Sequence, residues 1–315
     1  MKKKSIFCLL LALALALCAC APGSETLQGS EPFSEASSKP TEPSAEATAP
    51  STKETEPSTE PTNPPTEPTE PPVSPEPVPG EKTLRNLLAT ALQPVGKTLY
   101  VWGGGWNEAD DGAGVEAVSI GLAPAWEAFF QSQDGSYDYE EHRYQIHDGL
   151  DCSGYLGWVL YNVMNTESGG EGFVQSSTGF AKNLADRGFG TYTEAAQVTD
   201  YRAGDILSQK GHVWLVLGQC QDGSVLFVHC SPPALSICGT LGEKDEETMA
   251  SRLAQRYIAQ CFPELAAKFD THARPASSYL PVANQFRWND TLADPQGLGN
   301  LPVEELLQVL LPTGE

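Results

Sequence analysis

The sequence predicts a domain that contains both helices and strands, and two segments carry this prediction. Residues 152–164 repeat apolar side chains at a spacing of four in two adjacent stripes, which is typical of a helix buried over a wide face. Residues 212–229 hold two short runs rich in β-branched and aromatic side chains, with Asp222 and Gly223 between them. That arrangement favours a β-hairpin buried on both faces.

The N-terminus predicts an exported lipoprotein. Three lysines precede an apolar run too short for a stable bilayer anchor, which is the pattern of a secretory signal peptide over residues 1–19. The following cysteine, Cys20, comes after Ala19, and this resembles the bacterial lipoprotein signal, in which a small residue precedes the lipidated cysteine. We therefore expect acyl chains on Cys20, with an ordinary cleaved signal as the alternative. Several chains on one residue would make membrane attachment nearly permanent.

A tether is predicted for residues 20–80, which consist mainly of Pro, Thr, Glu and Ser. The segment has too few apolar side chains to bury enough surface to offset the conformational entropy lost on folding. We therefore expect a disordered and extended spacer. Such a spacer would give an enzyme at a membrane the reach to act on a wall above it. Residues 81–315 remain as one globular domain with additions.

The charge of that domain excludes some partners. The signal contributes +3 and the tether −9 to the net charge of −22, so −16 remains for residues 81–315. An acidic surface argues against nucleic acid and against anionic polymers as direct ligands. We expect a monomer and no cofactor.

Cysteines are odd in number in this domain, which leaves at least one thiol free or intermolecular in an exported protein. The five are Cys152, Cys220, Cys230, Cys238 and Cys261. Disulfides among the last four allow three full pairings, and a Cys220–Cys230 bond is disfavoured because the two residues lie at opposite ends of one strand. All four are alternatively reduced and buried.

Cys152 itself has several possible roles. Asp151 precedes it and is a good N-cap residue, so Cys152 falls in the first turn of the predicted helix. Backbone amides and the helix dipole there favour an anion, so we expect a stabilised thiolate and amides able to hold an oxyanion. This local pattern alone fits a nucleophile and a buried structural cysteine equally well.

A thiolate nucleophile needs a base and an orienting group. His142, His147 and His272 lie in polar, loop-like stretches and are interpreted as surface histidines. His212 and His229 instead stand at the two ends of the predicted hairpin. They are the candidates for the base and its partner, with ordinary core histidines as the alternative.

Four motifs in order then carry a family resemblance: LYVWGGG (99–105), DCSGYLGWVLY (151–161), AGDILSQKGHVWLVLG (203–218) and VLFVHCS (225–231). Together they resemble the NlpC/P60 family of bacterial cell-wall cysteine peptidases. The resemblance implies a papain-like α+β fold, in which a helix carrying the cysteine packs on an antiparallel sheet carrying the histidines.

The same resemblance assigns roles. It makes Cys152 the nucleophile, His212 the base and His229 the residue that orients the base. It places Tyr100 beside the nucleophile and makes Asp151 and Ser153, with Tyr100, the substrate-binding and oxyanion residues.

The implied substrate is the stem peptide of peptidoglycan, cut between D-glutamate and a diamino acid, outside a bacterial membrane. One alternative is an N-acetylmuramoyl-L-alanine amidase that uses the same thiol chemistry. Another is a wall-binding lipoprotein without activity.

Two regions depart from the family pattern. Residues 107–150 form a long acidic insertion with a predicted helix over residues 123–131, and it could serve as a lid or wall of the cleft. Residues 243–260 and 303–311 predict further helices that wrap the core. The sequence gives little support for a metal site. Cys152, His212 and His229 are possible zinc ligands, but their spacing fits no familiar zinc pattern. The acidic residues at 134–140 lack the glycine and the full length of an EF-hand calcium loop.

The hairpin register is a separate prediction. A two-residue turn at Asp222 and Gly223 would separate the two histidines. A six-residue loop over 218–223 would set His212 directly opposite His229, with Cys220 at the loop tip. The proposed chemistry favours the longer loop.

Overall fold

The computed structural model describes residues 76–165 and 170–312 of the chain. The helices are α1 (Leu84–Leu92), α2 (Pro124–Ser132), α3 (Cys152–Met164), α4 (Phe180–Asp186), α5 (Met249–Cys261), α6 (Pro263–Lys268) and α7 (Val303–Leu310). The strands are β1 (Gly190–Thr193), β2 (Ile206–Gln209), β3 (His212–Gln219), β4 (Val225–Ser231), β5 (Ala234–Leu241), β6 (Ala273–Pro275) and β7 (Asn284–Trp288). The fold is therefore α+β, as predicted.

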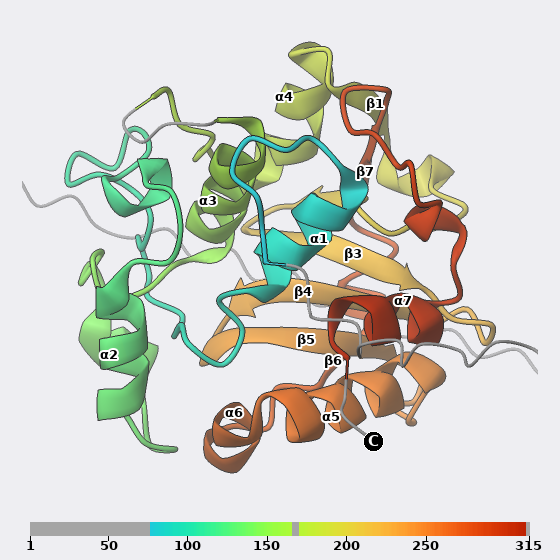
Figure 1. Ribbon diagram of the computed structural model, residues 1–315. Coiled ribbons are helices and arrows are strands. Elements are labelled where there is room, and N and C mark those ends of the chain that lie inside the picture. The colour runs from blue at the N-terminus through green and yellow to red at the C-terminus, as the bar shows by residue number, and fades with distance from the viewer. Residues whose placement is uncertain (1–75, 166–169, 313–315) are drawn as a thin grey trace, which may run out of the picture. The chain divides into compact units, whose positions relative to one another are not determined.

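Within the described residues, the strands form one seven-stranded sheet in the order β1-β7-β2-β3-β4-β5-β6 (Figure 1). Each neighbouring pair is antiparallel except β5 and β6, which run parallel. The central strands β3, β4 and β5 are buried along nearly their whole length. Burial on both faces explains why the sequence of the hairpin is almost continuously apolar.

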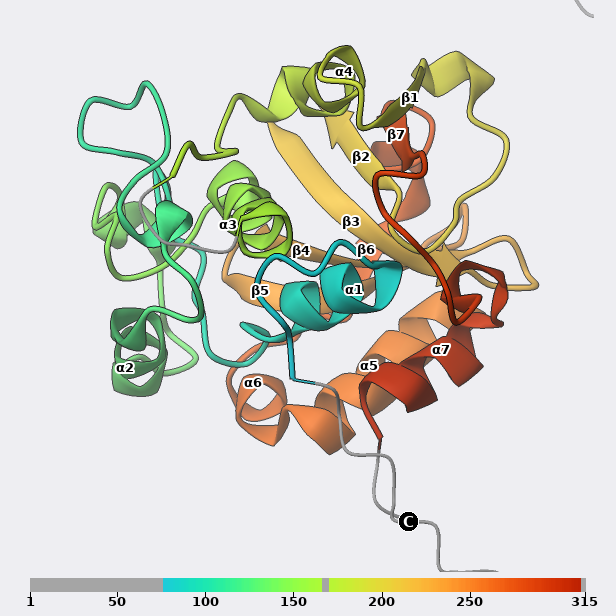
Figure 2. The same ribbon diagram turned by 45° about the horizontal axis from the view of Figure 1, so that its top comes forward.

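The two faces of the sheet bury different side chains. On one face, alternate residues of β3 such as Val213 and Leu215 join the main core with α1, α3, α5 and α7. Figure 2 shows α1 and α3 lying across that face. On the opposite face, Trp214, Phe227 and Tyr279 form a second, smaller core. Because side chains alternate along a strand, this division fixes which core each hairpin residue meets.

The predicted register of the hairpin is wrong. Leu215 pairs with Val228, and Val216 pairs with Phe227, a register that sets His229 across from Trp214 and not across from His212. Neither the two-residue turn nor the six-residue loop forms, because β3 extends to Gln219 and β4 begins at Val225.

Two local features produce the observed register. The pairing shifts between Val216 and Gly218, where one extra residue bulges out of β3. The connecting turn is then closed by Asp222, whose carboxylate accepts the backbone N–H of Ser224 at 3.1 Å and that of Met249 at 2.7 Å. Asp222 therefore ties the hairpin to the start of α5, and Cys220 is buried beside the turn and is not an exposed loop tip.

The three helices expected outside the four motifs are present, with one change of boundary. The helices in the insertion and near the C-terminus form as predicted, as α2 and α7. The helix predicted over residues 243–260 begins only at Met249, because Thr248 caps it by accepting the backbone N–H of Ser251 at 3.1 Å. Leu253 of α5 and Leu306 of α7 are buried in the main core, so these helices extend the domain.

The predicted signal peptide, Cys20 and nearly all of the tether lie outside the described residues. The last part of the expected tether contacts the domain: the amide of Val78 donates to Asn86 Oδ1 at 2.8 Å, and the amide of Gly80 donates to the carbonyl of Asn162 at 2.8 Å. None of the helices formed by residues 76–165 and 170–312 has the length and apolar character needed to cross a bilayer.

Candidate active site

Cys152 is the first residue of α3, and the helix starts there because Asp151 caps it. The Asp151 carboxylate accepts the backbone N–H of Ser153 at 2.9 Å and that of Gly154 at 2.7 Å. It also accepts the Ser153 hydroxyl at 2.8 Å. This cap is the one predicted from the sequence. It also commits the Ser153 and Gly154 amides, which are therefore not free to hold an oxyanion.

The glycines of the two N-terminal motifs let the backbone segments touch. A Cβ atom added to Gly154 would lie 2.0 Å from the carbonyl oxygen of Gly104, and one added to Gly105 would lie 2.6 Å from the Gly154 Cα. Close approach brings Trp106 over the helix start, where its Nε1–H donates to the Ser153 hydroxyl at 3.1 Å. The backbone around residue 104 therefore packs directly against the backbone around residue 154.

Substituting Gly154 with alanine should therefore push α3 away from the 103–105 segment. We expect a loss of about 1–3 kcal/mol in the free energy of unfolding, the usual cost of forcing atoms into a closely packed site. Urea unfolding followed by circular dichroism measures it. Alanine at Gly179 is the control, since a Cβ there meets no atom within 4 Å. Equal stability of the two variants would contradict the contact.

Tyr100 lies next to the start of α3. It bridges to Leu150, and its ring contacts Tyr139 of the insertion edge-on, with 5.4 Å between the ring centroids. Burial raises the pKa of the Tyr100 phenol strongly, with smaller contributions from Cys152 and Asp151. The phenol therefore stays protonated and can donate a hydrogen bond.

His212 and His229 are in direct contact despite the different register. Nε2 of His212 lies 3.0 Å from Nδ1 of His229. The two residues are diagonal neighbours on β3 and β4, and their rings meet edge-on at a centroid distance of 5.2 Å. Long side chains reach across such a diagonal, so the contact did not require the directly opposed pairing.

His229 is fully buried, and two residues to which the sequence assigned no role in the site contact its ring. Its Nε2 lies 3.2 Å from the sulfur of Cys238 on β5, and the Tyr279 hydroxyl lies 3.4 Å from its Nδ1. Cys238 in turn donates to the carbonyl of Thr271. The sequence singled out Cys238 only as one of four cysteines that are either paired or reduced and buried, and it gave no signal for Tyr279.

The sulfur of Cys152 reaches the backbone on either side of His212. It lies 4.0 Å from the carbonyl oxygen of Gly211, and the amide of Val213 also faces it. Cys152 belongs to the main core, whereas the His212 ring stacks on Trp214 over the other face of the sheet. Among the described residues, no hydrogen bond joins the Cys152 thiol to the His212 ring.

The expected thiolate is wrong for this structure. Burial, with a smaller contribution from the Asp151 carboxylate, raises the pKa of Cys152 to about 12, and the neighbouring amides offset only part of this. Burial and the charge of Arg274 lower the pKa of His212 to about 4. A helix start favours an anion only while water or amides reach it, and here desolvation is the larger effect. The resting pair is a neutral thiol and a neutral imidazole.

Of the remaining cysteines, Cys230 lies beside this arrangement and donates to the carbonyl of Leu150 at 3.0 Å, whereas His142, His147 and His272 make their contacts elsewhere. All five cysteines of the described residues are free thiols, so none of the disulfide pairings forms. His147 pairs with Glu116 and His272 with Asp270, and His142 stacks on Tyr137. No three His, Cys, Asp or Glu side chains gather as a metal site in the part of the chain that the structure describes.

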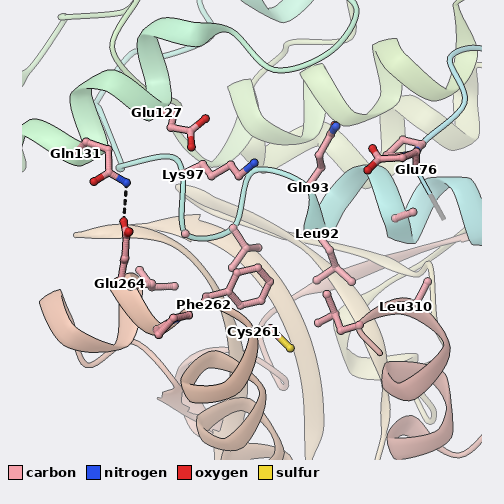
Figure 3. A pocket seen from close by; sticks show the side chains of 17 residues that line it. Glu76, Leu92, Gln93, Lys97, Glu127, Gln131, Cys261, Phe262, Glu264 and Leu310 are labelled. Carbon is pink, nitrogen blue, oxygen red and sulfur yellow. Dashed lines mark hydrogen bonds between the residues drawn. The ribbon is translucent and has the colours of Figure 1, made fainter. Parts of the chain in front are cut away.

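Two pockets lie elsewhere on the domain. One of about 410 Å³ is bounded by α1, α2, α6 and α7, and Figure 3 shows Lys97, Cys261 and the hydrogen-bonded pair Gln131 and Glu264 in its wall. The other, of about 500 Å³, lies between the 103–110 segment and the 144–148 segment. Neither pocket is lined by Cys152, His212 or His229.

No family model, no curated protein and no solved structure matches this chain.

Proposed function

We propose that this protein is a cysteine peptidase that cuts the stem peptide of peptidoglycan, with a papain-like arrangement of the NlpC/P60 type. The observation that carries the proposal is the convergence of a helix-start cysteine with a histidine dyad. Cys152 touches the backbone flanking His212, and the His212 ring is bonded to the buried His229. The substrate is supported by the motif resemblance alone.

Proton transfer is assigned to the remaining nitrogen of His212. Because Nε2 of His212 is bonded to His229, Nδ1 is the nitrogen left for the thiol. As the Cys152 sulfur bonds to the peptide carbonyl carbon, its proton passes to Nδ1, and the carbonyl oxygen becomes an oxyanion. His212 then returns the proton to the amine as the C–N bond breaks. Water attacks the resulting thioester, gives a proton to His212 and releases the carboxylic acid, and the thiol is restored.

The neutral resting pair fits this sequence. A neutral His212 is ready to accept a proton, and a neutral Cys152 has one to give, so attack and deprotonation occur together. The Cys152 amide, which faces the Cys152 sulfur, and the protonated Tyr100 phenol are our candidates for the donors that hold the oxyanion. Substrate binding must also bring Nδ1 within hydrogen-bond distance of the sulfur.

A histidine titration tests the charge state directly. We expect the rings of His212 and His229 to stay neutral from pH 8 down to pH 5, since burial lowers both pKa values below the usual value of about 6.5. Side-chain ¹⁵N NMR shifts measure this. An imidazolium signal from either ring at pH 6 would contradict it. If both rings stay neutral, a fall in activity as the pH drops through 6 must come from another group. We assign such a fall to Asp151, because burial raises the pKa of its carboxyl to about 6. Asp151→Asn should therefore abolish this pH dependence.

The reaction is tested on purified muropeptides, with the products identified by mass spectrometry. An endopeptidase yields a dipeptide ending in glutamate on the muramyl side and a fragment that begins with the diamino acid. An amidase yields the whole stem peptide instead. Binding without any product would support the wall-binding reading and refute the proposed function. Lipid on Cys20, which we propose as the membrane anchor, is tested separately by incorporation of labelled fatty acid.

A further inference from the structure

The contacts behind His229 form a chain with a defined direction. The carbonyl oxygen of Thr271 can only accept, so the thiol proton of Cys238 points toward it. The sulfur then has only lone pairs left for His229, whose Nε2 lies 3.2 Å away. His229 must therefore carry its proton on Nε2 and donate it to Cys238.

That proton fixes the next bond. In a neutral imidazole only one nitrogen is protonated, so Nδ1 of His229 is an acceptor. Its partner at 3.0 Å, Nε2 of His212, must then be the donor, which leaves Nδ1 of His212 unprotonated. The Tyr279 hydroxyl, 3.4 Å from the same Nδ1 of His229, is also a donor and is consistent with this assignment.

We propose that Cys238 is a positioning residue that sets the tautomer of His229 and, through it, keeps Nδ1 of His212 unprotonated and able to accept the thiol proton. The catalytic consequence rests on the proposed function, whereas the proton assignment does not. The groups that face His229 from neighbouring elements are His212 on β3, Phe227 on β4, Cys238 on β5 and Tyr279, with the charge of Arg274 on β6 nearby. Cys238 is the one that can accept at Nε2.

Three variants separate hydrogen bonding from packing. Cys238→Val keeps the approximate volume and removes the acceptor and the donor. Cys238→Ser keeps both functions in a hydroxyl. Cys261→Val is the matched control, since Cys261 is half-buried and lines a pocket away from the histidines.

The readout is the ¹⁵N shift of each histidine ring nitrogen at neutral pH in the mature protein, combined with kcat and KM on muropeptides. Wild type should show His229 and His212 both protonated on Nε2. Cys238→Val should mix the His229 tautomers and lower kcat about tenfold with KM unchanged, the size of one lost hydrogen bond. Cys238→Ser should restore both readouts, and Cys261→Val should alter neither.

Some results would overturn the inference. A wild-type His229 protonated on Nδ1 refutes the proton assignment. Wild-type kcat in Cys238→Val, or an equal loss in Cys238→Ser, refutes the positioning role. An inactive wild-type protein refutes the proposed function and with it the catalytic role of Cys238, while the spectra still decide the proton assignment.

Discussion

Replacing Cys152 with alanine should lower kcat for stem-peptide cleavage by roughly 10³-fold or more, because it removes the proposed nucleophile. Cys152 is 7% exposed, and its sulfur approaches the carbonyl oxygen of Gly211 at 4.0 Å, so we expect a small loss of packing. We expect the free energy of unfolding to change by about 1 kcal/mol or less. Activity is measured as product formation by mass spectrometry, and stability by urea unfolding.

Cys261→Ala is the matched control for this variant, because it also removes one thiol but lies outside the candidate site. It should retain wild-type kcat. His212→Ala should lose nearly as much activity as Cys152→Ala, and the double variant little more, since the members of a catalytic set act as a unit. Substantial turnover by a folded Cys152→Ala protein would end the cysteine-peptidase proposal.

Replacing Arg287 with methionine should destabilise the domain by roughly 3–5 kcal/mol, because it leaves a buried carboxylate without its counterion. Asp205 is 2% exposed, and the Arg287 guanidinium donates two hydrogen bonds to its carboxylate. Nε donates to Oδ1 at 2.9 Å, and Nη2 donates to Oδ2 at 2.7 Å. Burial still raises the pKa of Asp205 in spite of this pairing. The unfavourable desolvation of the Asp205 carboxylate therefore exceeds the favourable interaction with Arg287. Without Arg287, no ion pair would offset that desolvation.

The pH dependence of this loss has a definite sign. Removing Arg287 raises the folded pKa of Asp205 further above its unfolded value, so the deficit should be largest at neutral pH. It should shrink as pH falls toward the unfolded value, where both states bind the proton. Urea unfolding at pH 7 and pH 4.5 measures both.

Arg202→Met is the control for Arg287→Met. The Arg202 side chain is 61% exposed where it pairs with Asp200, so it should cost no more than about 1 kcal/mol. An equal cost for the two variants would contradict the buried-carboxylate argument.

Local patterns in the sequence predicted the parts of this protein that short-range physics controls. Asp151 caps α3 through bonds that span only a few residues, so the position of Cys152 in the first turn followed directly from the sequence. The existence of the hairpin, with a histidine in each of its strands, followed from its apolar runs. The beginning of α5 was missed because acidic residues before Thr248 also suit a helix, and only the cap hydrogen bond decides between them.

The tertiary structure alone decided how these parts meet. Register depends on a bulge after Val216 and on the bond from Met249 to Asp222, which joins residues far apart in the chain. The charge of Cys152 depends on how completely β3 and the 103–105 segment exclude water from its sulfur. That exclusion is a property of tertiary packing, and the sequence pattern at the start of a helix does not predict it. His229 contacts Cys238 of β5, a residue that the sequence did not connect with the histidines. The sequence thus determined which chemical groups are available and where the capped helix α3 begins, whereas long-range contacts determined the protonation, partners and separation of those groups.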